Sequence, residues 1–259
     1  MAGEFISLDG RLWLTLWTLL RYPGRLARDY FDGRGARYMR PLNLFLLLNL
    51  VFFVVQPHTG MLQWHLRGYL EGLQNAPALV ANARLDRARE AQRSRPSRSA
   101  APAPLRPESM EVFEASFEST IQNLKKSMLL VAIPLFAIAM TLVYGFRRRI
   151  AEHLIFATHF YAFVVFALTV LVPLLFISMR GWLLLIRAPD AAMNVLGTER
   201  ALMVALFVLF GVYLHVGLQR MYGDARFVAA LRAAALSGAY QLLLLTFALS
   251  MFRVTLWTM

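Results

Sequence analysis

Residues 154–179 read LIFATHFYAFVVFALTVLVPLLFISM, a run without a single Asp, Glu, Lys or Arg. A hydrocarbon core of about 30 Å needs about 20 helical residues, so this run is long enough to cross a membrane. Residues 127–146, 201–219 and 233–252 lack the same residue types over spanning lengths, and 41–56 form a shorter run of this kind. The five runs predict a membrane protein built from helices.

The composition of the chain agrees with this class. Of its 259 residues, 58% are hydrophobic and 16% are charged, whereas soluble domains are typically about 45–50% apolar and about 25% charged. The chain contains no cysteine, which excludes disulfides, zinc ribbons and iron–sulfur clusters. Pro173 lies inside the longest run and predicts a kink rather than a break, because neighbouring groups satisfy the freed backbone in a membrane.

We expect an all-α polytopic membrane protein with about five transmembrane helices, an interfacial N-terminal amphipathic helix and a long external loop. The expected segments are an interfacial segment at 1–40, transmembrane helices at 41–56, 127–146, 154–179, 201–219 and 233–252, and an external loop at 57–126 that contains a disordered centre at 93–107 and an amphipathic helix at 108–126. The centre is rich in Pro, Ser, Ala and Arg, a composition that buries too little apolar surface to fold.

The first apolar run of the chain, residues 12–20, is too short to span a bilayer. Trp13, Leu16, Trp17 and Leu20 recur within it at helical spacing, so one face of this helix is apolar and aromatic. Such a helix favours the membrane–water interface.

The net charge of +12 comes almost entirely from arginine, and the positions of the arginines predict the orientation. If the chain crosses the membrane five times, three arginine-bearing segments lie on one side: the N-terminal segment, the loop at 147–149 and the loop at 220–232. Short loops rich in Lys and Arg stay in the cytoplasm. We therefore expect the N-terminus inside and the C-terminus outside. Because the membrane topology accounts for the positions of the arginines, we expect no nucleic acid as a partner.

Residues 22–42 carry a pattern that consists of a Pro-Gly turn at 23–24, an aromatic-x-Gly-x-x-x-Arg-Tyr run at 31–38, and a Pro just before the first span. The pattern resembles the opening signature of a bacterial integral-membrane protein family catalogued as a domain of unknown function. Residues 148–160 and 218–223 are also similar to that family. The resemblance implies a protein of the bacterial inner (cytoplasmic) membrane, here without the cysteine-rich zinc-ribbon segment of longer family members, and it supplies no activity.

The arginines near this pattern are candidates for contacts with lipid headgroups. Asp29 and Asp32 can pair locally with Arg25, Arg28 or Arg34, and basic and aromatic side chains at a membrane boundary suit anionic headgroups. The candidate anionic-lipid contacts are Arg25, Arg28, Arg34, Arg37 and Arg40. A simple topology anchor explains the same residues, and the sequence leaves both interpretations open.

Polar side chains inside the apolar runs form a second candidate site. On the expected topology they gather in the cytoplasmic half, and ionisable groups at membrane depth are often functional. The candidate cluster is Asn49, Glu152, His153, His159, His215 and Gln241. Three interpretations are open: hydrogen bonds that hold helices together, a proton or ion path through Glu152, His159 and His215, and a metal or heme site that uses the histidines with Glu152.

The chain contains no GxSxG, phosphate-loop or GxGxxG motif. We expect Asp224 to be a solvated loop carboxylate paired with Arg226. The leading hypothesis is a non-enzymatic membrane scaffold or assembly component without a cofactor, whose partners are membrane lipids and either further copies of the chain or another membrane protein. The alternatives are a small channel or transporter that uses the polar cluster, and a membrane-embedded enzyme that acts on lipid with His159 as base.

Overall fold

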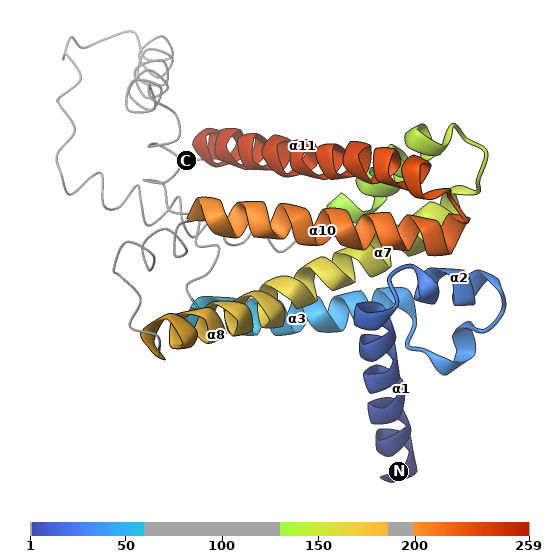
Figure 1. Cartoon of the computed structure of the whole chain (residues 1–259), viewed down its shortest axis with the longest axis horizontal. Coiled ribbons are helices and arrows are strands. Elements are labelled where there is room, and N and C mark those ends of the chain that lie inside the picture. Colours follow the sequence, from blue (N-terminus) through green and yellow to red (C-terminus); the bar gives the residue numbers. More distant parts are fainter. Residues whose placement is uncertain (1, 60–129, 186–198, 259) are drawn as a thin grey trace, which may run out of the picture. The chain divides into compact units, whose positions relative to one another are not determined.

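The computed structural model describes residues 2–59, 130–185 and 199–258, and every element within them is helical. In chain order these are α1 (Ala2–Arg21), α2 (Arg25–Phe31), the 3₁₀ helix η1 (Gly35–Arg37), α3 (Pro41–Thr59), a helix at Leu130–Tyr144, α7 (Ile150–Phe166), the π-helical η2 (Ala167–Leu171), α8 (Val172–Leu185), α10 (Glu199–Tyr222) and α11 (Arg226–Thr258) (Figure 1). The expected disordered centre at 93–107 and amphipathic helix at 108–126 lie outside the described residues.

Four helical stretches in the described residues are long and apolar enough to cross a membrane: Gly35–Val55, Ile150–Leu175, Val204–Tyr222 and Arg226–Phe247. The helix Leu130–Tyr144 is apolar but shorter in its described part, and residues 127–129, where the expected span starts, lie outside it. The prediction of an all-α polytopic membrane protein is therefore confirmed. The helix α3 continues to Thr59, three residues beyond the end expected for the first span at residue 56.

The chain divides into two compact units. The first consists of Met1–Met61 and Leu129–Leu244, and the second of Leu62–Met128 and Leu245–Met259. In the second unit, only the last part of α11 is described. All of the candidate site residues belong to the first unit.

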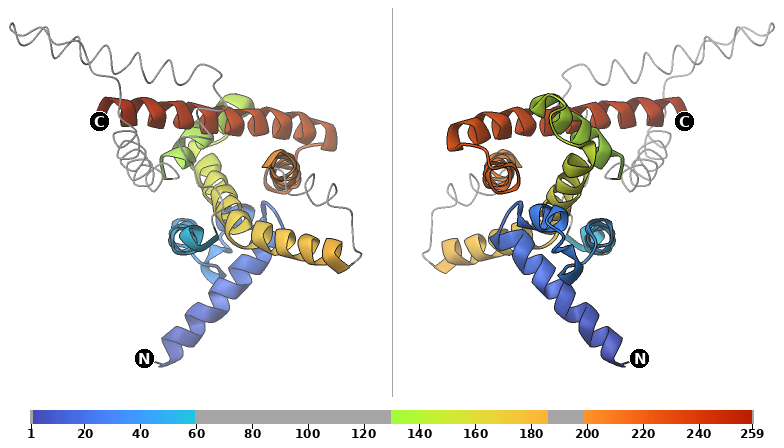
Figure 2. Two further views of the ribbon diagram at one scale, coloured as in Figure 1. Left: turned by 90° about the vertical axis from the view of Figure 1, so that its left-hand side faces the viewer. Right: turned by 90° about the vertical axis from the view of Figure 1, so that its right-hand side faces the viewer.

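The longest apolar run forms one helical path, α7–η2–α8, with π-helical geometry in its middle segment. Pro173 lies just beyond this segment, lacks an N–H and crowds the carbonyl group of Thr169, four residues earlier. A π segment widens a helix and is a usual place for a bend. Figure 2 shows that α8 leaves in a different direction from α7, so the kink expected from Pro173 is present.

α7 is the central helix of the first unit. Of its apolar window, 67% is buried, against 22–33% for the other three spans. The helices α1, α2 and α3 pack on it, and α10 packs on α2. Aromatic rings fill the space around it: Phe160 contacts Phe136 and Tyr240, and Phe163 stacks on Tyr213 with ring centroids 3.7 Å apart.

The N-terminal helix α1 lies across the direction of α3 and α10 (Figures 1 and 2). It extends well beyond the expected run at 12–20. Trp13 and Trp17 are 74% and 59% exposed, whereas Thr18 and Leu19 are buried. If α3 and α10 cross a membrane, a helix in this direction with exposed tryptophans lies along the membrane surface. The interfacial position stays a prediction, and this geometry supports it.

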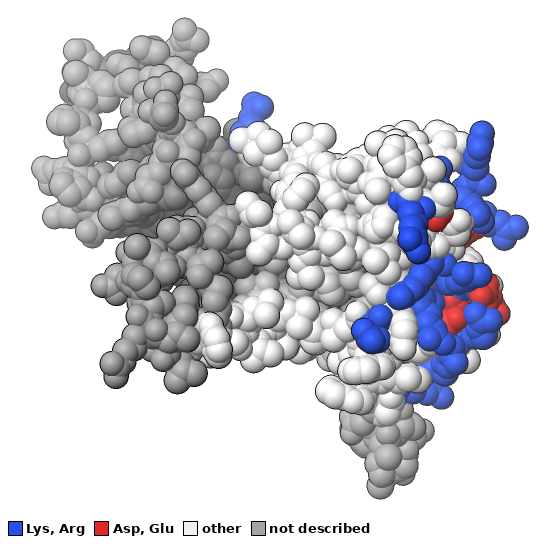
Figure 3. All heavy atoms as spheres, viewed as in Figure 1, with Lys and Arg blue, Asp and Glu red and all other residues white. Residues whose placement is uncertain are grey.

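Arginines gather at one end of the first unit (Figure 3), which we call the basic end. Hydrogen bonds join the helix ends there through the pairs Arg28–Arg220, Tyr144–Asp224 and His153–Tyr222. These contacts bring the N-terminal segment, the 147–149 loop and the 220–232 turn to the same end. A chain that crosses the membrane five times at the expected spans places these three segments on the same side of the membrane.

Candidate functional site

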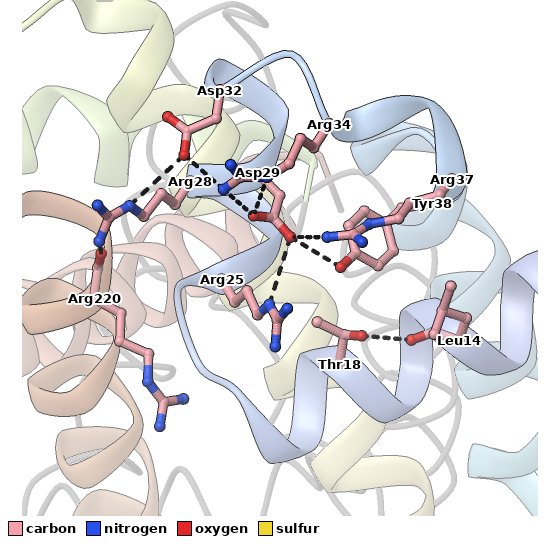
Figure 4. A network of polar contacts seen from close by, with 10 residues as sticks. All are labelled: Leu14, Thr18, Arg25, Arg28, Asp29, Asp32, Arg34, Arg37, Tyr38 and Arg220. Atoms are coloured by element: carbon pink, nitrogen blue, oxygen red, sulfur yellow. Dashed lines mark hydrogen bonds and ion pairs between the residues drawn. The ribbon is translucent and has the colours of Figure 1, made fainter.

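One buried carboxylate organises the basic end: that of Asp29 in α2, which is 3% exposed (Figure 4). Its Oδ1 accepts hydrogen bonds from Arg34, at 2.8 Å from Nη2 and 3.2 Å from Nε. Its Oδ2 accepts hydrogen bonds from Arg37 Nη2 at 2.6 Å and from the Tyr38 hydroxyl at 2.9 Å. Arg25 adds an ion pair with 3.5 Å between Nε and Oδ2. We call these five residues the Asp29 cluster.

The turn after α2 brings these groups back over Asp29. Gly33 follows the helix with φ of 76°, a left-handed conformation that glycine adopts freely. The backbone N–H of Arg34 then donates to the Asp29 carbonyl oxygen at 2.8 Å, which brings the Arg34 side chain beside the carboxylate. The 3₁₀ helix η1 follows and ends at Arg37, which reaches the second carboxylate oxygen.

The carboxyl group of Asp29 is ionised over the physiological pH range. Burial acts to raise the pKa of Asp29, but hydrogen bonds from Arg34, Arg37 and Tyr38 outweigh it and lower the pKa from 3.8 to about 2. The hydrogen bond to Asp29 in turn raises the pKa of Arg34. The carboxylate therefore offsets part of the positive charge of its arginines.

The helix α2 docks on α10 through a backbone contact. Gly24 has φ of 79°, and a Cβ atom at this position would overlap the carbonyl oxygen of Gly217. A Cβ atom on Gly217 would lie 3.0 Å from the ring of Phe156 in α7. Arg28 Nη1 donates to the carbonyl oxygen of Arg220 at 3.1 Å (Figure 4) and so caps the C-terminal end of α10. Two glycines thus set how closely the N-terminal segment approaches the spans.

Asp224, in the turn between α10 and α11, is a second paired carboxylate. The Tyr144 hydroxyl donates to its Oδ2 at 2.7 Å, and Arg232 Nη1 donates to its Oδ1 at 2.5 Å. The Arg232 guanidinium also lies 4.2 Å from the centre of the Tyr144 ring, a cation–π contact. The expectation of a solvated Asp224 paired with Arg226 is wrong: the side chain is 10% exposed and its ion pair is with Arg232. The packing of Tyr144 from another helix shields this carboxylate.

Two residues of the predicted polar cluster lie at the start of α7, beside this turn. His153 is fully buried, and its Nδ1 lies 2.8 Å from the Tyr222 hydroxyl. Glu152 forms an ion pair with Arg148, with 3.9 Å between Oε2 and Nη1. The Tyr144, His153 and Tyr222 rings pack together, with the two tyrosine centroids 4.4 Å apart. His153 thus belongs to an aromatic cluster at the basic end.

The other four predicted residues are in separate surroundings. His159 Nδ1 donates to the carbonyl oxygen one turn earlier in its own helix, at 2.9 Å. His215 Nε2 accepts a hydrogen bond from the Gln219 amide at 2.8 Å, also within one helix. Asn49 has a buried Oδ1 without a hydrogen-bond partner in the described residues. Gln241 is exposed.

The structure does not join the six predicted residues into one site. No hydrogen bond or ion pair in the described part of the chain connects any two of them. Over those residues, no three His, Asp or Glu side chains stand in an arrangement that could hold a metal ion. The space beside His159, which Leu19, Phe156 and Phe160 help to line, has no room for a water molecule.

The local pairing that the sequence predicts is confirmed: Asp29 pairs with Arg25 and Arg34, and Asp32 pairs with Arg28. The Arg25–Asp29 and Arg28–Asp32 pairs are four residues apart and can be read from helical spacing, whereas Arg34 lies five residues after Asp29 and beyond the end of α2.

Sequence reasoning missed the remaining partners. The glycine turn after α2 is a signal that could have indicated the return of Arg37 and Tyr38 to Asp29. No sequence signal connects Tyr144 with Asp224, because the two residues are 80 positions apart and meet only through helix packing.

Comparison with known proteins adds a family match at the N-terminus. Residues 9–53 match the family model described as protein of unknown function (DUF3667). The match contains the whole Asp29 cluster and residues 22–42, whereas residues 148–160 and 218–223 lie outside it. No curated protein and no solved structure matches the chain. Over the segment that folds as most of α1, α2, η1 and most of α3, the chain is therefore similar to a family of unknown function.

Proposed function

We propose that the protein is a non-enzymatic membrane component, a scaffold or assembly partner. The observation that carries the proposal is that polar groups at its helix ends bind one another across helices. Tyr222 of α10 binds His153 of α7. Tyr144 and Arg232, from two further helices, share the carboxylate of Asp224. Hydrogen bonds of this kind hold membrane helices together, at about 0.6–2 kcal/mol each.

His159 supports the same interpretation. Its side chain is 6% exposed, its Nδ1–H is bound to a carbonyl group of α7, and Phe156 and Phe160 pack beside it in a space too small for water. Proton relays in membranes run through successive ionisable groups or water-filled cavities. The surroundings of His159 favour packing over conduction.

A small channel or transporter is the second candidate, and one observation favours it. Three atoms of the predicted polar cluster are buried without a hydrogen-bond partner in the described residues: His153 Nε2, His215 Nδ1 and Asn49 Oδ1. Buried polar atoms are nearly always bound to protein or ordered water. A hydrated path past these three atoms would satisfy them.

Proton flux separates the two functions. The full-length protein is reconstituted in liposomes that contain a pH-sensitive dye, and a pH gradient is imposed. We expect liposomes that contain the protein to show the same proton flux as protein-free liposomes. A protonophore serves as the positive control. The variant His153→Gln with His215→Gln is run in parallel. Flux above the protein-free rate that falls in this variant would overturn the scaffold in favour of the channel.

A scaffold also requires a stable assembly. One chain has a mass of 29.4 kDa. Particles extracted from native membranes in polymer nanodiscs should contain this chain in a fixed ratio with a second copy or another membrane protein. The variant His159→Leu, which puts an apolar side chain in the packed space, should retain that ratio. Particles that contain a single chain and lipid alone would contradict the proposal.

We further infer that the basic end faces the cytoplasm of a bacterial inner membrane. The support is that three arginine-bearing segments meet at this end, and such segments stay in the cytoplasm. Because the chain has no cysteine, single-cysteine variants test the orientation. A membrane-impermeant maleimide added to spheroplasts should label Asp190→Cys, between α8 and α10 in sequence, and spare Arg226→Cys. The reverse pattern would invert the orientation.

A further inference from the structure

A hollow of about 540 Å³ opens at the basic end. Arg11 of α1 lines one part of its wall, and Tyr30 and Ala36, from α2 and η1, line another. Arg40, directly before α3, and Asn43, in the first turn of α3, also line it. All five residues are exposed. The hollow lies entirely within the segment that matches the family of unknown function.

The two arginines of the hollow differ from those near Asp29. Four arginines pair with Asp29 or Asp32: Arg25, Arg28, Arg34 and Arg37. In the described part of the chain, the side chains of Arg11 and Arg40 have neither an ion pair nor a hydrogen bond. Two guanidinium groups without a carboxylate partner favour an anion, and the oxygens of a phosphate match the planar fork of arginine.

Apolar surface continues directly from the hollow. Asn43, Leu46 and Leu50 lie at positions i, i+3 and i+7, so they share one face of α3. Leu46 is 46% exposed and Leu50 is 63% exposed. The hollow therefore lies where the charged end meets the apolar span. An anion with an apolar tail fits this arrangement better than a soluble phosphate.

We propose that this hollow binds the phosphate-bearing headgroup of an anionic membrane lipid. Arg11 and Arg40 bind the phosphate oxygens, and the Asn43 amide donates to an oxygen of the headgroup. An acyl chain lies along Leu46 and Leu50. This site is more specific than a general basic surface, because it combines a hollow with two arginines, Arg11 and Arg40, that have no ion pair in the described part of the chain. It does not depend on the scaffold function.

Lipid binding to the full-length protein tests the proposal. Delipidated protein in mild detergent is titrated with phosphatidylglycerol or phosphatidylcholine, and native mass spectrometry counts the bound lipids. We expect one phosphatidylglycerol to bind at least about tenfold more tightly than phosphatidylcholine. The variant Arg11→Gln with Arg40→Gln should lose this preference.

A matched variant controls for charge. Arg147→Gln with Arg226→Gln removes two exposed charges from the same end but outside the hollow. Its affinity for phosphatidylglycerol should stay within about threefold of the wild-type value, because general attraction to an anionic surface is modest per charge. Equal losses in the two double variants would show a general charge effect and overturn the proposal.

Soluble competitors distinguish the lipid from a free phosphate compound. Glycerol 3-phosphate and inorganic phosphate carry the same anion without acyl chains. At millimolar concentration neither should displace bound phosphatidylglycerol. Displacement by either compound would overturn the assignment to a lipid.

A filled hollow provides a test that leaves both arginines in place. Ala36→Trp puts an indole into the wall at an exposed position. It should weaken phosphatidylglycerol binding by about tenfold, while thermal unfolding in detergent without lipid stays close to that of the wild type. Retention of the lipid by this variant would show that the lipid binds elsewhere.

Discussion

Gly24 and Gly217 meet backbone to backbone, and this contact joins the N-terminal segment to α10. Gly24→Ala should therefore be strongly destabilising. The new methyl group would overlap the Gly217 carbonyl oxygen, and alanine is strained at φ of 79°. Overpacking and backbone strain together should lower the free energy of unfolding by about 2–5 kcal/mol. Thermal unfolding of the purified protein in detergent measures this loss.

Gly223→Ala is the matched control for that variant. Gly223 has a similar φ of 73°, but nothing lies within 4 Å of a Cβ atom placed there. This substitution should therefore carry only the backbone strain, about 1 kcal/mol. Equal losses in the two variants would contradict a close contact between α2 and α10.

Asp29→Asn should loosen the segment between α2 and α3. The substitution leaves Arg25, Arg34 and Arg37 around a neutral amide that cannot hold them. Removing one partner of a buried ion pair is strongly destabilising, and here we expect about 2–4 kcal/mol. Asp32→Asn serves as the control, because that carboxylate is 41% exposed and its pairs should be worth at most about 1 kcal/mol. Faster proteolysis of the segment in the first variant alone is the expected result.

The acid dependence of stability should report the same carboxylate. The pKa of Asp29 is about 2 in the folded protein, below the ordinary value of 3.8. Its contribution, about 2 kcal/mol, is therefore fully present above pH 4 and is lost as the pH falls toward 2. Unfolding midpoints of the wild type and Asp29→Asn should converge over this window. A constant difference from pH 6 to pH 2 would show that ionisation of Asp29 does not stabilise the fold.

The sequence predicts those parts of the molecule whose evidence is local. The absence of charge over 154–179 indicates a span, and the i, i+4 spacing of Arg25 and Asp29 indicates an ion pair. Both appear in the structure. The bend near Pro173 belongs to the same class, because proline affects only its own helical turn.

The sequence does not predict how the spans pack against one another. Lipid tails are as apolar as the interior of the protein, so hydrophobic periodicity does not show which face of a span is buried. The depth of a residue in the membrane can be counted along its helix. The side of the helix on which the residue lies relative to the neighbouring helices cannot be counted in this way. His159 and Gln241 therefore share the inner half of the predicted topology, yet His159 is buried and Gln241 is exposed.

The partner of Asp224 allows a direct test of such packing. Arg232→Gln should lower the free energy of unfolding by about 1–2 kcal/mol, because it removes a charged hydrogen bond to a mostly buried carboxylate. Arg226→Gln, which changes the partner expected from the sequence alone, should have an effect below about 0.5 kcal/mol. Tyr144 binds the same carboxylate, so Tyr144→Phe and Arg232→Gln should combine non-additively, with a coupling of about 0.5 kcal/mol or more. Strictly additive losses would show that Tyr144 and Arg232 do not share Asp224, and the docking of the helix Leu130–Tyr144 on the α10–α11 turn would then be wrong.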